Sequence, residues 1–215
     1  RTVRGPDGTV RFAEQWTIDA EGRAATLVER VEVVGDSVRV TTGGSTRTIS
    51  RTPDLYVGLR TGTPLETAAL AAHLVARGTG ATTLGGASVR AELVQTLTTE
   101  GSRTRQRVRF VVIHTGTQPD PTGVWLDDRG ALVATDVQWF ITVRATERAQ
   151  LPVLRRTELA WRAARGEALA TRVRTATAGT IVIANGDLFD AETGRLRPRQ
   201  SIVITGDRIV AVGDP

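Results

Sequence analysis

The stretch that decides the C-terminal fold reads Gly179-Thr-Ile-Val-Ile-Ala-Asn-Gly-Asp-Leu-Phe-Asp190, and ten residues later Ser201-Ile-Val-Ile-Thr-Gly-Asp-Arg-Ile-Val-Ala-Val-Gly-Asp-Pro215. The first run predicts one long strand, and residues 191–200 predict a loop. The second run predicts a tight hairpin, because Gly206-Asp207 lies between two apolar runs and glycine readily adopts the positive φ of a two-residue turn. The expected cross-strand partners are Ile202 and Ile204 on one strand with Ile209 and Ala211 on the other. An isolated hairpin is marginal in water, so these strands need a sheet to join.

This order of strand, loop and hairpin resembles the opening strands of amidohydrolase-superfamily enzymes of the imidazolonepropionase-like type. Two motifs carry the resemblance: Ile181-Val-Ile-Ala-Asn-Gly186 and Gly206-Asp-Arg-Ile-Val-Ala-Val-Gly213. The resemblance covers about residues 179–215. It implies a small β domain beside a (β/α)8 barrel, in a parent enzyme whose bound metal activates water to attack an amide or other C–N bond. In that family the metal ligands, which start with a His-x-His pair, come further along the chain.

The sequence supplies no residue set for that chemistry. Its two histidines, His73 and His114, lie in neither His-x-His nor His-Glu-x-x-His spacing. We therefore assign no catalytic, cofactor-binding or metal-binding residue, and interpret each imidazole as exposed or hydrogen-bonded. A zinc-like divalent metal is expected only in the barrel of the parent enzyme. That barrel, or a second chain, is the expected partner.

Composition limits the other classes of function. The 215 residues are 40% hydrophobic, enough for a core, and no apolar run approaches the ~20 residues of a membrane-spanning helix. Cysteine and methionine are absent, which excludes disulfides, a thiol nucleophile and a Cys-based zinc site. The net charge is +5, but the 28 basic residues are all arginines spread along the chain among 23 acids, so nucleic-acid binding is not predicted. The chain begins at Arg1 without an initiator Met, and export to the periplasm or medium is expected from the family resemblance alone.

Residues 1–150 predict a β-rich domain. The run Thr9–Ile18 alternates, with Val10, Phe12, Trp16 and Ile18 expected on one face. Further strands are expected at 25–33, 88–99, 105–114, 131–135 and 137–143, and residues 78–86 are expected to form a Gly/Thr loop. The expected fold class is therefore mainly β (α+β): a curved antiparallel sheet with a packed helix.

The clearest helix is predicted at about residues 64–78. Thr63 suits the N-cap, Pro64 the first turn, and Glu66 completes a capping box, while Gly78 is a natural stop. Residues 151–178 predict a helical connector over 154–173 that is kinked or broken at Gly166. The domain boundary is expected near residue 175, and residues 179–215 are interpreted as the truncated start of the amidohydrolase-type β domain.

Several other side chains belong to types that carry out catalysis or binding. The acids Asp127, Asp128, Asp187, Asp190 and Glu192 lie in turn-like contexts and are expected to bond the local backbone. Serines 88, 102 and 201 lack a nucleophile elbow, and Gly78-Thr-Gly80 and Gly85-Gly86 lack the context of a phosphate loop. The four tryptophans are expected to be core anchors rather than pocket walls: Trp16, Trp125, Trp139 and Trp161.

Three functions follow from these observations. The first is a non-catalytic N-terminal part of an amidohydrolase-like enzyme. The second is a β module that binds an apolar ligand or a peptide. The third is a structural subunit that forms homo-oligomers or filaments by adding strands to a neighbouring sheet edge.

Overall fold

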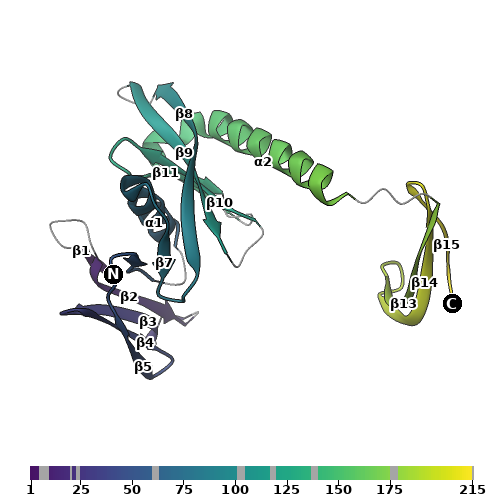
Figure 1. Cartoon of the computed structure of the whole chain (residues 1–215), viewed down its shortest axis with the longest axis horizontal. Coiled ribbons are helices and arrows are strands. Elements are labelled where there is room, and N and C mark those ends of the chain that lie inside the picture. Colours follow the sequence, from purple (N-terminus) through teal and green to yellow (C-terminus); the bar gives the residue numbers. More distant parts are fainter. Residues whose placement is uncertain are drawn as a thin grey trace. The chain divides into compact units, whose positions relative to one another are not determined.

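The computed structural model describes residues 1–4, 10–19, 21–22, 25–59, 63–100, 105–116, 120–136, 140–174 and 179–214. The chain divides into two compact units, Arg1–Trp161 and Arg162–Pro215. Strands dominate both units (Figure 1), which confirms the predicted mainly β class with a packed helix. The division between the units falls inside a helix, and residues 175–178, at the boundary expected from the sequence, lie outside the described residues.

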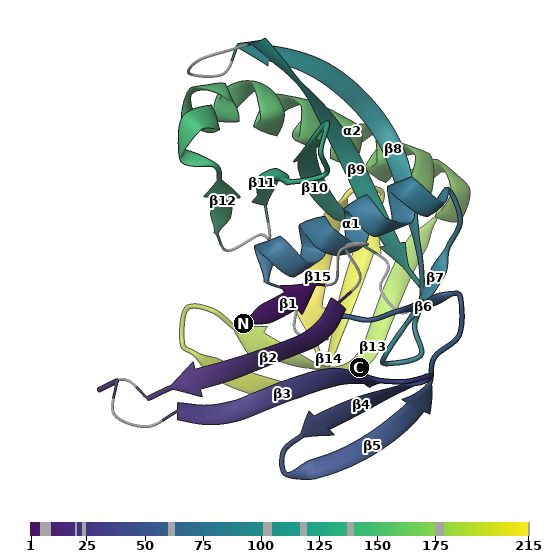
Figure 2. The ribbon, with the colours of Figure 1, turned by 90° about the vertical axis from the view of Figure 1, so that its left-hand side faces the viewer.

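The first unit begins with a five-stranded antiparallel meander (Figure 2). Its strands are β1 (Thr2–Arg4), β2 (Val10–Ile18), β3 (Ala25–Val34), β4 (Ser37–Thr42) and β5 (Ser45–Ser50). Short turns join β3 to β4 at Gly35-Asp36 and β4 to β5 at Gly43-Gly44, where Gly35, Gly43 and Gly44 adopt a positive φ. The buried side chains of this sheet include Val31, Val38 and Val40, which contact Val57 and Leu84.

Strand β2 does not present the face expected from its alternation. Val10 and Ala13 are buried, whereas Trp16 is 44% and Ile18 66% exposed. The cause is a bulge: Val3 pairs with Phe12 but Arg4 pairs with Val10. One extra residue in a strand moves the following side chains to the opposite face, so a strict period of two fails here.

A second, seven-stranded sheet holds the rest of the β structure of this unit. Its strands are β6 (Leu55–Tyr56), β7 (Ala81–Thr83), β8 (Ser88–Glu100), β9 (Arg105–Thr115), β10 (Thr122–Asp127), β11 (Leu132–Asp136) and β12 (Ile141–Val143). They run in the order β12-β11-β10-β9-β8-β7-β6. Residues 1–150 thus hold two sheets, and β6 pairs with β7 in parallel while the other neighbours are antiparallel.

The expected loop at residues 78–86 contains strand β7. Ala81 is buried and pairs with Val89, and Thr82 pairs with Leu55. These partners lie 8 and 27 residues away in the sequence. The segment Ala81-Thr-Thr83 carries no apolar period of its own, so pairing with its neighbours makes it a strand.

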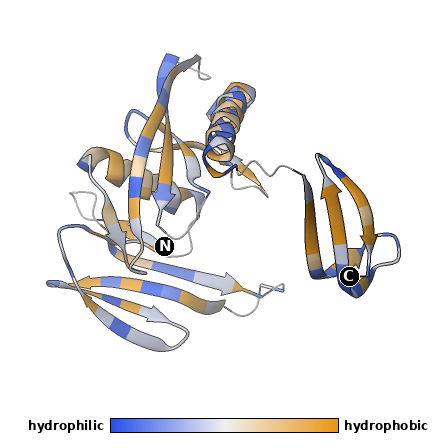
Figure 3. Cartoon of the chain, turned by 45° about the vertical axis from the view of Figure 1, so that its right-hand side comes forward, coloured by the Kyte–Doolittle hydropathy of each residue, from blue (hydrophilic) through white to orange (hydrophobic). Residues whose placement is uncertain are grey.

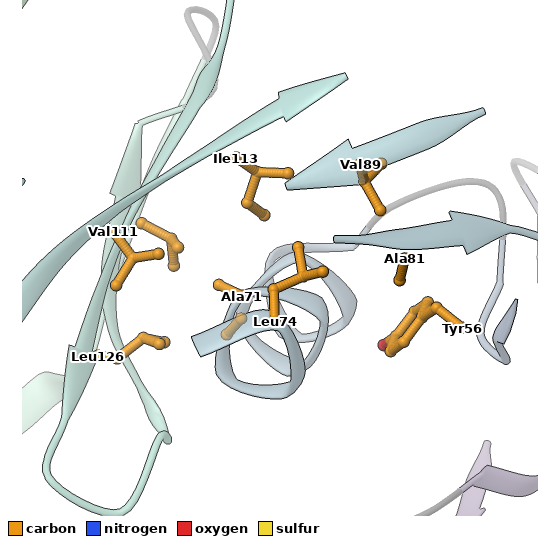
Figure 4. Packing of buried hydrophobic residues seen from close by; sticks show 10 residues of the cluster. Tyr56, Ala71, Leu74, Ala81, Val89, Val111, Ile113 and Leu126 are labelled. Atoms are coloured by element: carbon orange, nitrogen blue, oxygen red, sulfur yellow. The ribbon is translucent and has the colours of Figure 1, made fainter. Parts of the chain in front are cut away.

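Helix α1 (Pro64–Arg77) covers one face of the second sheet. The Thr63 hydroxyl accepts a hydrogen bond from the Glu66 amide at 3.2 Å, and Gly78, at φ 68°, ends the helix in the left-handed conformation. Both ends of the predicted helix are confirmed. Ala71 and Leu74 are buried against the sheet, among side chains shown in Figure 4 such as Val111, Ile113 and Leu126.

The other face of this sheet is covered by the start of helix α2 (Leu151–Val173), which follows a 3-10 helix, η1 (Ala145–Gln150). Leu154 is fully buried there. The Phe110 ring stacks on Trp125, with centroids 4.9 Å apart, and meets Trp161 edge-on at 5.8 Å. Helix α2 is continuous through Gly166, so the predicted break is absent.

The second unit carries a three-stranded antiparallel sheet, β13 (Thr180–Asp190), β14 (Arg195–Thr205) and β15 (Arg208–Gly213). The predicted hairpin is confirmed, with Gly206 at φ 62° in the two-residue turn. Residues 195–200 belong to β14 rather than to a loop. Ile204 pairs with Ile209 as expected, but a bulge shifts the register so that Ala211 pairs with Val203.

Candidate binding groove

A groove of about 770 Å³ lies beside the N-terminal end of α1. Three parts of the first unit line it: strands β1 and β2, the start of α1, and the turn between β10 and β11. The lining side chains that matter below are Arg4, Glu14, Trp16, Leu65, Glu66 and Leu132. These segments are far apart in the sequence, so only the folded unit brings them together.

Glu66 is the most unusual residue of this groove. It is a carboxylate with only 8% of its surface exposed. Its Oε1 accepts a hydrogen bond from the Thr2 hydroxyl at 3.1 Å, while its Oε2 is buried and has no hydrogen-bond partner among the residues that the structure describes. A buried carboxylate oxygen without a donor is costly, and such groups are uncommon in folded proteins. The helix N-terminus favours this negative charge, since Glu66 lies in the first turn of α1.

Tyr56 and His73 form a second polar pair close to this carboxylate. Burial, followed by the negative charge of Glu66, raises the pKa of Tyr56 to about 12, although Arg4 acts in the opposite direction. Burial, with the charges of Arg77 and Arg4, lowers the pKa of His73. Both the Tyr56 hydroxyl and His73 Nε2 are buried; Arg4 is a neighbour of the hydroxyl, and His73 Nε2 has no hydrogen-bond partner among the described residues. His73 as a whole is half-buried: its ring packs against Tyr56, and Nε2 is the ring atom that this packing buries.

A second groove, of about 620 Å³, lies at the other end of the sheet, around β7, β8 and the end of β9. Asp54, Ser88, Arg90 and His114 are among its lining residues. His114 Nε2 lies 2.9 Å from Glu92 Oε2, which confirms a hydrogen-bonded imidazole. Hydrogen bonds from the side chain of Thr52, its own backbone and Thr82 lower the pKa of Asp54. The groove thus offers an ionised carboxylate and hydroxyl groups among small and apolar residues such as Ala81 and Val89.

Among the acids at turns, Asp127 performs the local role that the sequence predicts, whereas Asp128 pairs with Arg107, 21 residues away. Asp127 Oδ1 accepts hydrogen bonds from the amides of Arg129 (3.0 Å) and Ala131 (2.9 Å), and Oδ2 lies 2.8 Å from Arg144. Burial alone would raise the pKa of Asp127, but Arg144 and these amides outweigh it and lower the pKa.

The C-terminal turn repeats this arrangement. Asp190 Oδ1 accepts from the amides of Glu192 and Thr193, and the amide and hydroxyl of Thr193 are the main reason that the pKa of Asp190 is lowered. The turn role predicted for Asp127 and Asp190 is confirmed.

The remaining candidates separate into buried and exposed positions. Trp125 and Trp161 are core anchors as expected, whereas Trp16 lines the first groove and its prediction as a core anchor is wrong. Ser201 is buried in the second unit with no partner for its hydroxyl. Ser102 and Trp139 lie outside the described residues.

Across the described ranges, no cluster of three or more His, Asp or Glu side chains is placed to hold a metal ion.

The β13–β15 sheet presents an aliphatic surface, which we term the isoleucine face. Directly paired residues in neighbouring strands share a face, and the register pairs Ile181 with Ile204 and Ile183 with Ile202. Strand β15 adds two more side chains opposite β14. The face consists of Ile181, Ile183, Ile202, Ile204, Ile209 and Val212. Apolar positions fill these strands (Figure 3), and the exposed fraction reaches 64% at Ile209.

In comparisons with known proteins, no protein-family model, no curated protein and no solved structure matches the chain. In the part of the chain that the structure describes, none of the helices combines the length and the apolar composition needed to cross a membrane.

Sequence reasoning missed the groove beside α1. Glu66 is visible in the sequence only as a helix-capping residue, and half of the capping box is present, since its amide bonds to Thr63. That its carboxylate is buried depends on Thr2, 64 residues away. Tyr56, the single tyrosine of the chain, carries no motif that would mark it.

Proposed function

We propose that this chain is the non-catalytic N-terminal part of an amidohydrolase-like, metal-dependent hydrolase. Residues 179–214 would form the opening strands of the small β domain, and the first unit would be an accessory domain. The parent enzyme would hydrolyse an amide or another C–N bond at a divalent metal held by its barrel. The two histidines in this sequence do not supply that metal site.

The observation that carries the proposal is the isoleucine face. The three strands bury few side chains among themselves, and their aliphatic face is exposed. A contiguous apolar surface of this kind on a small sheet is typical of a sheet that another part of a protein covers. This agrees with the sequence resemblance, in which these strands belong to a domain that packs beside a barrel.

A hydrolysis assay tests the proposal directly. We expect the purified 215-residue chain to hydrolyse no member of a panel of amides, cyclic amides and esters, with or without added zinc or manganese. We also expect the reading frame after codon 215 to encode a His-x-His motif within the next few dozen codons, and the longer product to hydrolyse a panel member with added metal. Metal-dependent hydrolysis by the 215-residue chain, or a frame without that motif, would contradict the proposal.

A second candidate function is assembly through the same sheet. In the order β13-β14-β15, the outer strands β13 and β15 each pair with only one neighbour among the described strands. Unpaired strand edges add readily to another edge. Sedimentation of the chain and of a Val210→Lys variant, which puts a charge on the edge strand β15, tests this candidate. Assembly predicts oligomers that the lysine disrupts, and a strict monomer of the unmodified chain removes this candidate.

A further inference from the structure

We infer that Asn185 is a site of spontaneous modification, at which the side-chain amide is lost and an aspartate or isoaspartate is left in strand β13. The reaction is a deamidation through a cyclic imide, and water is its only co-reactant. Asn185 is followed by Gly186 and is the single asparagine of the chain. This inference concerns the chemistry of one residue and does not depend on the hydrolase proposal.

The irregular backbone at Asn185 supplies the first argument. Strand β13 advances three residues from Ile183 to Gly186, whereas their partners on β14, Ile202 and Gln200, are only two apart. Strand β13 therefore carries one extra residue here, which is a β-bulge. Asn185 lies in this bulge with φ 56°, in the left-handed region that asparagine enters more readily than most other residues.

A second bulge follows directly, on the neighbouring strand. Between Gly186 and Leu188 the extra residue belongs to β14, where Arg199 has φ 52°. Asn185 and Arg199 are the non-glycine residues with a positive φ in the part of the chain that the structure describes. The regular ladder is thus interrupted on both sides of Gly186, so the backbone opens more easily here than in an unbroken ladder.

The accessibility of the reacting groups supplies the third argument. Asn185 is exposed, and none of the described residues hydrogen-bonds its side-chain amide. Gly186 has no Cβ atom to hinder its backbone nitrogen. This nitrogen forms a bond to Cγ of Asn185, the bond between Cγ and Nδ2 breaks, and ammonia leaves with the proton of the Gly186 amide.

Water then opens the cyclic imide at one of its two carbonyl carbons. Attack at Cγ of residue 185 gives aspartate, whereas attack at its backbone carbonyl carbon gives isoaspartate. Isoaspartate places the side-chain methylene in the main chain of β13. Both products add a carboxylate, so either one lowers the net charge of the protein from +5 to +4.

Ageing of the folded 215-residue chain at 37 °C and pH 7.4 tests the inference. We expect the intact mass to rise by the difference between an amide and an acid. Tryptic peptide 175–195, which contains Asn185 and no glutamine, should carry the change as two products that reversed-phase chromatography separates. Because base removes the Gly186 amide proton, the reaction should be several-fold faster at pH 8.4. An unchanged mass over a period in which the same chain deamidates in urea, or a change confined to glutamine, would overturn the inference.

The Gly186→Ala variant is the matched control. A Cβ atom at this position would meet only the backbone oxygen of Gln200, at 4.0 Å, and the φ of Gly186 is outside the left-handed region. Alanine therefore fits the strand, but its methyl group hinders the attacking nitrogen, so deamidation should be several-fold slower. Equal rates in a variant with an unchanged circular dichroism spectrum would reject the site.

The Asn185→Asp variant provides a second check if Gly186→Ala does not fold. It already carries one of the two products, so its mass should stay constant under the same ageing. Its tryptic peptide should elute with the aspartate product of the natural sequence. A mass increase equal to that of the natural sequence would place the reaction at another residue and overturn the inference.

Discussion

The ring of Tyr56 lies against the imidazole of His73, with centroids 5.2 Å apart and ring planes inclined by 56°. Tyr56 comes from the short strand β6, and His73 from the middle of α1. The contact therefore joins the edge of the second sheet to the helix that covers it. Both the tyrosine hydroxyl and His73 Nε2 are buried, so the pair places two polar atoms in a poorly solvated position.

This contact makes stability depend on pH. The pKa of His73 is lowered in the folded protein, chiefly by burial, so the unfolded chain binds a proton more readily. The contribution of neutral His73 is present above about pH 6.5 and is lost as the pH falls through the lower folded-state pKa. We expect the free energy of unfolding, measured with urea between pH 7.5 and pH 5, to fall more steeply for the natural sequence than for His73→Gln. Equal slopes for the natural sequence and His73→Gln would contradict this assignment.

The turn acid Asp127 should matter far more than its neighbour. Asp127→Ala removes acceptors for two backbone amides and for Arg144, whose side chain is only 31% exposed. We expect a loss of about 1–3 kcal/mol in the free energy of unfolding, since each group left unpaired has a cost. Asp128→Ala removes only an exposed pair with Arg107 and should change stability by less than about 1 kcal/mol. Equal effects at the two positions in chemical denaturation would contradict this assignment.

At Gly123, the backbone of β10 lies close to the side chains of Phe110 and Glu158. A Cβ atom at this position would lie 2.8 Å from the Phe110 ring and 3.0 Å from Glu158 Oε1. Gly123→Ala should therefore destabilise the first unit by about 1–3 kcal/mol through overpacking. The loss should appear in denaturation followed by tryptophan fluorescence, because Phe110 stacks on Trp125. A variant as stable as the natural sequence would contradict the prediction, because it would show that the neighbouring side chains can move to accommodate the added methyl group.

Gly166 should respond in the opposite sense. It lies inside α2, and a Cβ atom there would meet nothing within 4 Å. Alanine loses less backbone entropy than glycine when a helix forms, so Gly166→Ala should stabilise the helix by about 0.5–1 kcal/mol. The expected result is higher helicity by circular dichroism at temperatures where the helix begins to melt. Lower helicity would mean that the glycine is required for a contact outside the described residues.

Features written in adjacent residues could be predicted from the sequence. Thr63, Pro64 and Gly78 determine both ends of α1, because caps act within one turn of a helix. The Gly206-Asp207 turn likewise determines the last hairpin. In each case the residues that decide the structure lie within a few positions of the structure that they decide.

Features that depend on distant partners could not be predicted. Strand β7 forms because Leu55 pairs with Thr82, and the exposed position of Trp16 follows from the way β1 pairs with β2. The groove beside α1 forms only when the chain brings Thr2, Glu66 and Leu132 close together. No local pattern specifies such meetings, since they follow from the packing of a whole unit.

The isoleucine face also has a consequence for how the protein behaves in a test tube. Contact between water and the aliphatic side chains of this face is unfavourable. Association of two molecules through the face therefore lowers the free energy in concentrated solution. Salts that strengthen apolar association should lower solubility, and a mild detergent should restore it. The net charge of +5 makes the molecules repel one another, which opposes this association at low ionic strength. The solubility of the protein thus depends on the balance between apolar association through the isoleucine face and electrostatic repulsion between molecules of the same net charge.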